Sequence, residues 1–190
     1  TGWAAGLRRG ARVVPLTVTA AVYEASTLWW RLTAAVPAGV LSELYDLRVT
    51  AAGGIDDVTR HAVRVLPAYR GSYYFVQITD PHLPTNLYYT DAGSAADSSE
   101  VLDLRAVIDD VNLINPEFVV ITGDLIHEGE LEEFLDRRYY SRAQRVLGEF
   151  AVPVFLLAGN HDIGGWDDTP PSDGTARRDW WRFFGWKRLA

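Results

Sequence analysis

Phe118-Val-Val-Ile-Thr-Gly-Asp124 is the stretch around which the sequence is organised. Its first five residues are apolar or β-branched, with Asn115-Pro116 before them and Gly123 after them. A short continuous run of this kind is typical of a strand that is buried on both faces in a parallel sheet. A carboxylate, Asp124, follows directly. Ligands bind at this carboxyl edge in open α/β sheets.

Two other segments repeat the pattern of a buried strand followed by polar side chains. Phe75-Val-Gln-Ile-Thr79 leads into Asp80-Pro81-His82, and Val154-Phe-Leu-Leu-Ala158 leads into Gly159-Asn160-His161-Asp162. The carboxyl ends of parallel strands meet at one edge of a sheet. The sequence therefore predicts that three strands deliver metal-ligand side chains to the same place.

Composition limits what such a site can contain. The 190 residues are 48% hydrophobic, which is enough for one good core or two small ones. No apolar run reaches the length of a membrane span. Cysteine is absent, so a metal ion would be held by His, Asp, Glu, Asn or water. The first residue is Thr and methionine is absent, which suggests a piece of a longer protein.

The charge is unevenly distributed along the chain. Residues 1–71 carry a net charge of +3 and residues 72–190 a net charge of −10, which together give −7. The acidic second part argues against a grip on the phosphate backbone of nucleic acid. It suits cation binding, although a solvated acidic surface is the simpler explanation of the charge alone.

Residues 1–12 are rich in Gly and Arg and are interpreted as a loose arm or linker. Residues 13–71 are predicted to form an all-β module, because Leu44–Thr50 alternates apolar and polar side chains as a strand with one wet face does. Tyr45 is either the corner tyrosine of an immunoglobulin-like β-sandwich or a partly buried tyrosine on an edge strand.

From residue 72 the pattern changes to alternating strands and helices, so residues 72–190 are predicted to form a mixed α/β domain with parallel strands. Helices are expected around residues 101–111, over residues 130–150 and over residues 176–184. The aromatic side chains of the last segment, Trp180, Phe183 and Phe184, share one helical face. Packing in the core is the expectation, with substrate stacking as the alternative.

The individual motifs each have a plain alternative. Asp80 and His82 reach one side of an extended chain, and Pro81 favours extended geometry at Asp80. Asn160 could be a metal ligand, a helix cap or a turn residue. Asp162 could orient His161 through a ring nitrogen or be a surface acid.

Taken together, the three strand ends fit a binuclear metal centre. A carboxylate such as Asp124 can bridge two cations, because its oxygens offer several lone-pair directions. Two metal ions can clamp a phosphoryl group and lower the pKa of a bridging water. An adjacent histidine such as His161 could stabilise developing charge or protonate a leaving group.

Asp80-x-His82, Gly123-Asp124 and Gly159-Asn160-His161-Asp162, in this order after buried strands, resemble the first three motifs of the calcineurin-like metallophosphoesterase superfamily. The resemblance implies a two-sheet β-sandwich with flanking helices, of which residues 72–190 would supply the N-terminal half. It implies that Asp80 and His82 bind a first metal ion, that Asp124 bridges and that Asn160 binds the second. His161 would be the catalytic histidine, and Asp162 is included with it as a candidate.

A β module before the catalytic domain is similar to that of secreted family members, including purple acid phosphatases. This similarity favours an extracellular or periplasmic location. The family pattern continues with a further histidine and a Gly-His-x-His motif, whereas the last histidine here is His161. We therefore expect an incomplete site whose other half lies further along the same protein or on a separate chain. His127 could reach the rim of the site or be a loop residue.

The predicted function is hydrolysis of a phosphate mono- or diester by a hydroxide held between two divalent or trivalent ions such as Fe, Zn or Mn. One alternative is a non-catalytic binding or assembly module that keeps the fold. Another is a Mg²⁺-dependent transferase or phosphatase of doubly wound fold, with an Asp nucleophile after the first strand. His82 and Asn160-His161 argue against the last alternative, since Mg²⁺ prefers oxygen ligands.

Overall fold

The computed structural model describes residues 2–26, 28–83, 99–127, 139–163 and 175–185. The chain forms two compact units, Thr1–Gly71 and Ser72–Ala190. Within the described residues, no helix has both the length and the apolar character that a membrane crossing requires.

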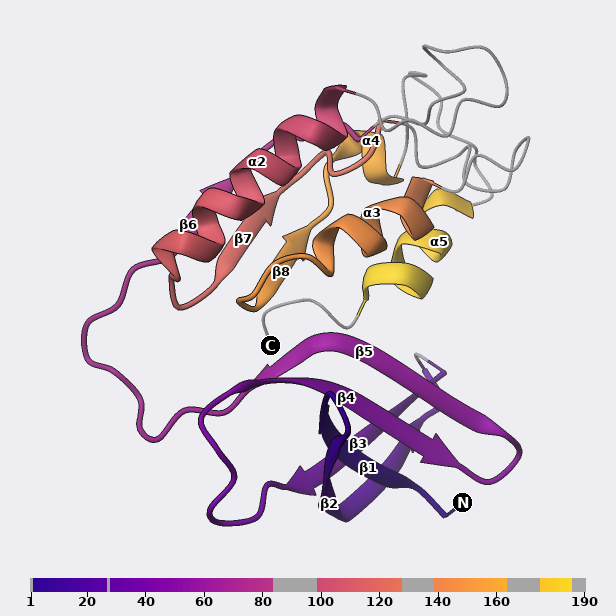
Figure 1. Ribbon diagram of the computed structural model, residues 1–190. Helices are drawn as coiled ribbons and strands as arrows, with labels where there is room; N and C mark the ends of the chain where they lie inside the picture. Colours follow the sequence, from indigo (N-terminus) through magenta and orange to yellow (C-terminus); the bar gives the residue numbers. More distant parts are fainter. Residues whose placement is uncertain (1, 27, 84–98, 128–138, 164–174, 186–190) are drawn as a thin grey trace. The chain divides into compact units, whose positions relative to one another are not determined.

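The first unit is a single antiparallel sheet with the strand order β3-β2-β1-β4-β5 (Figure 1). An immunoglobulin-like sandwich needs two packed sheets, so that part of the fold prediction is not confirmed. A hairpin turn at Gly53-Gly54 joins the last two strands: both glycines have positive φ, and Ala51 pairs with Ile55. The strands are β1 (Ala4–Arg9), β2 (Arg12–Glu24), β3 (Trp29–Ala35), β4 (Leu44–Ala51) and β5 (Ile55–Arg64).

The N-terminal segment is not the loose arm that its composition suggested. Strand β1 lies in the middle of the sheet and pairs with both β2 and β4. Gly10, at a φ of 57°, allows the tight turn that leads into β2, and Leu7 is fully buried. Tertiary pairing on both edges therefore decides the structure of a segment whose own composition favours no strand.

Tyr45 is the other anchor of this unit. Its side chain is buried, and its hydroxyl donates a hydrogen bond of 3.1 Å to the carbonyl of Leu41, four residues upstream. A hydroxyl bound to upstream backbone is the feature that defines a corner tyrosine. This contact resembles that of a corner tyrosine, but the immunoglobulin-like sandwich is not confirmed. Tyr45 is buried on a strand inside the sheet, so it is not the partly buried tyrosine of an edge strand either.

The second unit contains a parallel sheet with the order β6-β7-β8, as the alternation of strands and helices predicted. The helix expected around residues 101–111 is α2. The helix expected over residues 130–150 is described only in part, as α3, because residues 128–138 lie outside the described ranges. The elements are β6 (Val76–Ile78), α2 (Ser99–Ile114), β7 (Val119–Thr122), α3 (Tyr139–Leu147), β8 (Val154–Leu157), α4 (Asn160–Ile163) and α5 (Thr175–Phe184).

One hydrophobic core joins the sheet of the second unit to α2, α3 and α5 (Figure 1). Alternate strand residues such as Val119 and Ile121 are fully buried in it. Trp180 and Phe184 are buried against Tyr140, which confirms that the aromatic face of the last helix packs in the core. The core also includes Leu125 and Ile126, which directly follow Asp124. Their burial fixes the backbone at the carboxyl end of β7.

Candidate metal centre

The ends of β6 and β7 continue side by side beyond the regular strands. The N–H groups of Asp80, His82 and Leu83 donate to the carbonyls of Gly123, Asp124 and Leu125, at 3.3, 2.9 and 2.9 Å. These hydrogen bonds hold the two polar motifs next to each other. The motifs that lie more than 40 residues apart in the sequence therefore form one strand-end structure.

The backbone at these strand ends is left-handed. Gly123 has a φ of 87°, and Asp80, His82 and Asp124 have φ values of 53°, 43° and 46°. The expectation that Pro81 makes Asp80 extended is therefore wrong. The hydrogen bonds to the end of β7 hold Asp80 in a conformation that costs free energy, and strain of this kind concentrates at functional sites.

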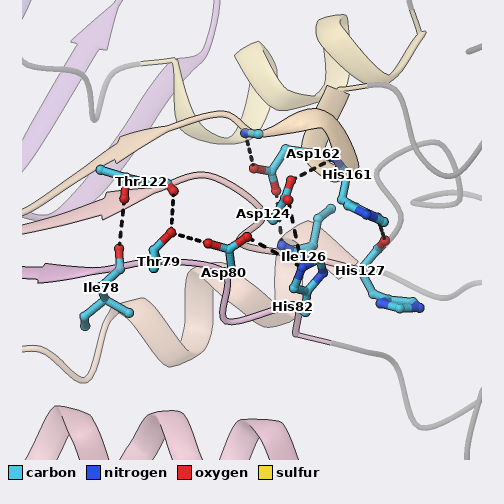
Figure 2. A network of polar contacts seen from close by, with 11 residues as sticks. Ile78, Thr79, Asp80, His82, Thr122, Asp124, Ile126, His127, His161 and Asp162 are labelled. Atoms are coloured by element: carbon cyan, nitrogen blue, oxygen red, sulfur yellow. Dashed lines mark hydrogen bonds and ion pairs between the residues drawn. The ribbon is translucent and has the colours of Figure 1, made fainter.

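Side chains from all three strand ends converge (Figure 2). Potential ligand atoms of His82, Asp124 and His161 lie within 4.8 Å of one another. The Nε2 atom of His82 is 3.9 Å from an oxygen of Asp124 and 3.9 Å from Oδ1 of Asp80. These separations are too long for hydrogen bonds.

The same separations suit a cation. Bonds from a borderline metal ion to imidazole nitrogen and carboxylate oxygen are about 2.0–2.2 Å long, so two ligand atoms of one ion lie at most about 4.4 Å apart. The Nδ1 atom of His82 is also buried, and it has no hydrogen-bond partner within the described ranges. The His82 ring is thus not satisfied by hydrogen bonds to its neighbours, and the donor set of imidazole and carboxylate groups fits a metal ion.

Asp124 is held firmly from the neighbouring strand end. Its Oδ1 accepts a hydrogen bond of 2.9 Å from the N–H of His161. Gly159 packs directly against it, because a Cβ atom at Gly159 would lie 2.2 Å from Oδ1 of Asp124. The other oxygen, Oδ2, faces His82. One oxygen is therefore engaged by the protein while the second points toward the cluster.

The ring of His161 is oriented by main chain from the loop after β7. Its Nδ1 lies 2.8 Å from the carbonyl oxygen of His127. A carbonyl only accepts, so Nδ1 carries the hydrogen and Nε2 keeps its lone pair in the neutral ring. The His127 ring also stacks on that of His161, with 6.0 Å between centroids. His127 therefore lies beside the site, and no sequence pattern predicts a contact made by a backbone carbonyl.

Asp162 does not act on His161 in the expected way. It is fully buried, its Oδ1 accepts from the N–H of Ile126 at 3.1 Å and its Oδ2 accepts from the N–H of Gly159 at 2.8 Å (Figure 2). Burial raises the pKa of its carboxyl group to about 6, although the backbone N–H groups counteract part of the shift. Its two oxygens tie the strand ends of β7 and β8 together.

This role predicts the effect of Asp162→Asn. The amide would point an NH₂ group at one of two backbone donors, so one hydrogen bond is lost and a buried N–H is left unpaired. Relief of the buried charge offsets part of the loss. We expect the free energy of unfolding in urea at pH 7 to fall by about 1–2 kcal/mol.

The control for this prediction is Asp103→Asn, which makes the same chemical change at an exposed position on α2. It should leave the urea midpoint unchanged. Equal stability of the Asp162→Asn variant and the wild type would contradict the tying role of Asp162.

Asn160 is the first residue of α4 and is exposed, one residue before His161. Its place at the carboxyl end of β8 is compatible both with a metal ligand and with the start of a short helix. Its role as a ligand stays a prediction.

The comparisons with known proteins agree with the motifs. The sequence profile of the family described as calcineurin-like phosphoesterase matches residues 73–189, which is more than half of the chain. The chain therefore belongs to the calcineurin-like phosphoesterase family.

Curated relatives cover the same region. A probable cyclic nucleotide phosphodiesterase of Vesicomyosocius okutanii subsp. Calyptogena okutanii is 28% identical over 91 residues, which are 48% of this chain and 34% of the relative. The serine/threonine-protein phosphatase CPPED1 of Homo sapiens is 28% identical over 116 residues, 55% of this chain and 35% of the relative. The chain thus spans about a third of the length of the curated relatives it matches.

Among solved structures, a purple acid phosphatase, PPD1 from yellow lupin seeds, aligns with 93% of this chain and with 33% of its own length. The TM-score is 0.45 and the sequence identity is 12%.

Proposed function

We propose that the protein containing this chain hydrolyses a phosphate mono- or diester at a metal centre on the carboxyl edge of the β6-β7-β8 sheet. The observation that carries the proposal is the meeting of His82, Asp80 and Asp124, in which Nε2 of His82 lies 3.9 Å from an oxygen of each carboxylate, a separation that suits a cation. The ring of His161 lies beside this group. Family membership supports it, and the printed names of the relatives are those of a phosphodiesterase and a phosphatase.

Asp80, His82 and Asp124 would hold one metal ion, and Asp124 with Asn160 would contribute to a second. Fe, Zn or Mn fits this mixture of imidazole, carboxylate and amide donors. When bound, such ions supply a Lewis acid for the phosphoryl oxygens and a water of lowered pKa. Ligands for the second ion beyond Asp124 and Asn160 would come from elsewhere in the protein.

The remaining work falls to side chains of this chain. With its Nδ1 hydrogen held by the carbonyl of His127, His161 offers Nε2 at the edge of the cluster. In the protonated ring, Nε2 can donate to a phosphoryl oxygen or give its proton to the leaving oxygen. Asp124 keeps this ring close, because its Oδ1 binds the backbone N–H of the same residue.

The test is hydrolysis of p-nitrophenyl phosphate and bis-p-nitrophenyl phosphate by the whole protein. Treatment with EDTA should lower the rate at least about 100-fold, since the ions supply several kcal/mol of charge stabilisation, and Mn²⁺ or Zn²⁺ should restore it. The ratio of the two rates separates a monoesterase from a diesterase. A folded protein that hydrolyses neither ester with any of these ions would instead favour the non-catalytic binding module.

A further inference from the structure

Thr79 directly precedes Asp80 and lies outside the Asp80-x-His82 motif, but its side chain contacts Asp80. Its single hydroxyl hydrogen has two acceptors within reach, Oδ2 of Asp80 and the carbonyl oxygen of Thr122 on β7 at 3.0 Å (Figure 2). The charged carboxylate is the stronger acceptor, so we assign the hydrogen to Asp80. The hydroxyl is therefore directed at a carboxylate of the candidate metal centre.

The two carboxylates of the centre differ in how they are fixed. The Asp124 side chain is 13% exposed and is bound by the backbone N–H of His161. The Asp80 side chain is 54% exposed and stands on left-handed backbone at the end of a three-residue strand. An exposed carboxylate loses rotamer freedom when it binds a cation, so a hydrogen bond that already orients it reduces that cost.

The two oxygens of Asp80 have different neighbours. Oδ2 accepts from Thr79, whereas Oδ1 is the atom that lies 3.9 Å from Nε2 of His82. With Oδ2 held by the hydroxyl, Oδ1 is left facing the imidazole with its lone pairs available. This is the arrangement in which one cation can contact both His82 and Asp80.

We propose that Thr79 is a positioning residue whose hydroxyl orients the Asp80 carboxylate for metal binding. The proposal rests on the proposed function, because it concerns the same centre. Groups that hydrogen-bond a ligating side chain typically change metal affinity tenfold to a hundredfold. The partly exposed position of Asp80 puts the expected effect near the lower end of this range.

The direct test compares Thr79→Val with Thr79→Ser by calorimetric titration of Mn²⁺. Valine keeps the shape and removes the hydroxyl, so the dissociation constant should rise about tenfold. Serine keeps the hydroxyl and should bind within about twofold of the wild type. Thr122→Val is the matched control. It removes a hydroxyl that accepts from Nε2 of Gln77 and does not contact Asp80, and it keeps the Thr122 carbonyl. Its Mn²⁺ affinity should be unchanged.

A double-mutant cycle with Asp80→Ala separates positioning from general structural damage. If Thr79 acts through the Asp80 carboxylate, Thr79→Val should have no further effect on Mn²⁺ affinity once that carboxylate is gone. An equal loss in both backgrounds would overturn the proposal, as would wild-type affinity in the Thr79→Val single variant.

The failure of this inference is distinguishable from that of the proposed function. If the wild type binds Mn²⁺, Asp124→Asn does not and Thr79→Val binds normally, only the role of Thr79 is wrong. If the folded wild type itself binds neither Mn²⁺ nor Zn²⁺, the metal centre is wrong, and the role of Thr79 falls with it.

Discussion

Replacing Asp124 by Asn should weaken Mn²⁺ binding at least about 100-fold, which exceeds the effect of losing a group that only supports a ligand. Asn keeps an oxygen in the place of Oδ1, which accepts from the N–H of His161. It removes the negative charge and the second carboxylate oxygen, which faces His82. Hydrolysis by the whole protein should fall at least about 1,000-fold, because both candidate ions depend on this carboxylate.

Stability measured without metal distinguishes this result from misfolding. Asp124 is a nearly buried carboxylate, so its replacement by a neutral isostere should leave the free energy of unfolding equal or higher. Asp103→Asn, at an exposed position on α2, serves again as the control and should change neither property. Normal Mn²⁺ affinity in Asp124→Asn would remove this residue from the centre.

Gly159→Ala should be the most damaging change of a single methyl group at the site. A Cβ at Gly159 would lie 2.2 Å from Oδ1 and 2.5 Å from the backbone nitrogen of Asp124, and real Cβ contacts do not come this close. The strand ends would have to separate, because backbone cannot rotate away as a flexible side chain can. We expect a loss of about 3 kcal/mol in the free energy of unfolding, together with weakened Mn²⁺ binding.

The matched control is Gly71→Ala. Neither glycine has a positive φ, but a Cβ at Gly71 would have no neighbour within 4 Å. The two variants therefore share the change in backbone entropy and differ in the close approach to Asp124. Thermal unfolding and Mn²⁺ titration measure both consequences. If Gly159→Ala and Gly71→Ala have the same unfolding temperature and the same Mn²⁺ affinity, the tight packing of Gly159 against the Asp124 carboxylate supports neither stability nor metal binding.

The parallel sheet could be predicted because its strands are short, mostly apolar runs that are followed closely by Gly or Asp. Such runs favour strands, but the expected burial on both faces is not found: Val119 and Ile121 are buried, whereas Val120 is half-buried and Leu157 is exposed. The amphipathic spacing that predicted α2 and α5 is equally local.

Strand β1 could not be predicted, because the pairing of Ala4–Arg9 with β2 and β4 is a tertiary effect. The single sheet of the first unit was missed for the same reason, since alternation in Leu44–Thr50 shows a wet face but not how many sheets are present.

The candidate site was predictable at the level of which strand ends meet. Residue type and position after a strand predicted that Asp80, His82, Asp124 and His161 would come together, and the structure brings them together.

The supporting contacts were not predictable. The contact between Nδ1 of His161 and the carbonyl oxygen of His127 uses a main-chain group. Every residue has such a group, so no residue type in the sequence indicates the contact. The geometry of Asp80 was misjudged because hydrogen bonds to the end of β7 outweigh the local influence of Pro81. Asp162 neither orients His161 nor lies at the surface, because its burial directs it to backbone donors.

The measurement that tests the metal centre most directly is anomalous diffraction from crystals of the protein grown with Mn²⁺. We expect a strong anomalous peak within about 2.3 Å of a ring nitrogen of His82 and of carboxylate oxygens of Asp80 and Asp124. A peak bound elsewhere, or no peak at these residues at saturating Mn²⁺, would contradict the assignment of this sheet edge as a metal centre.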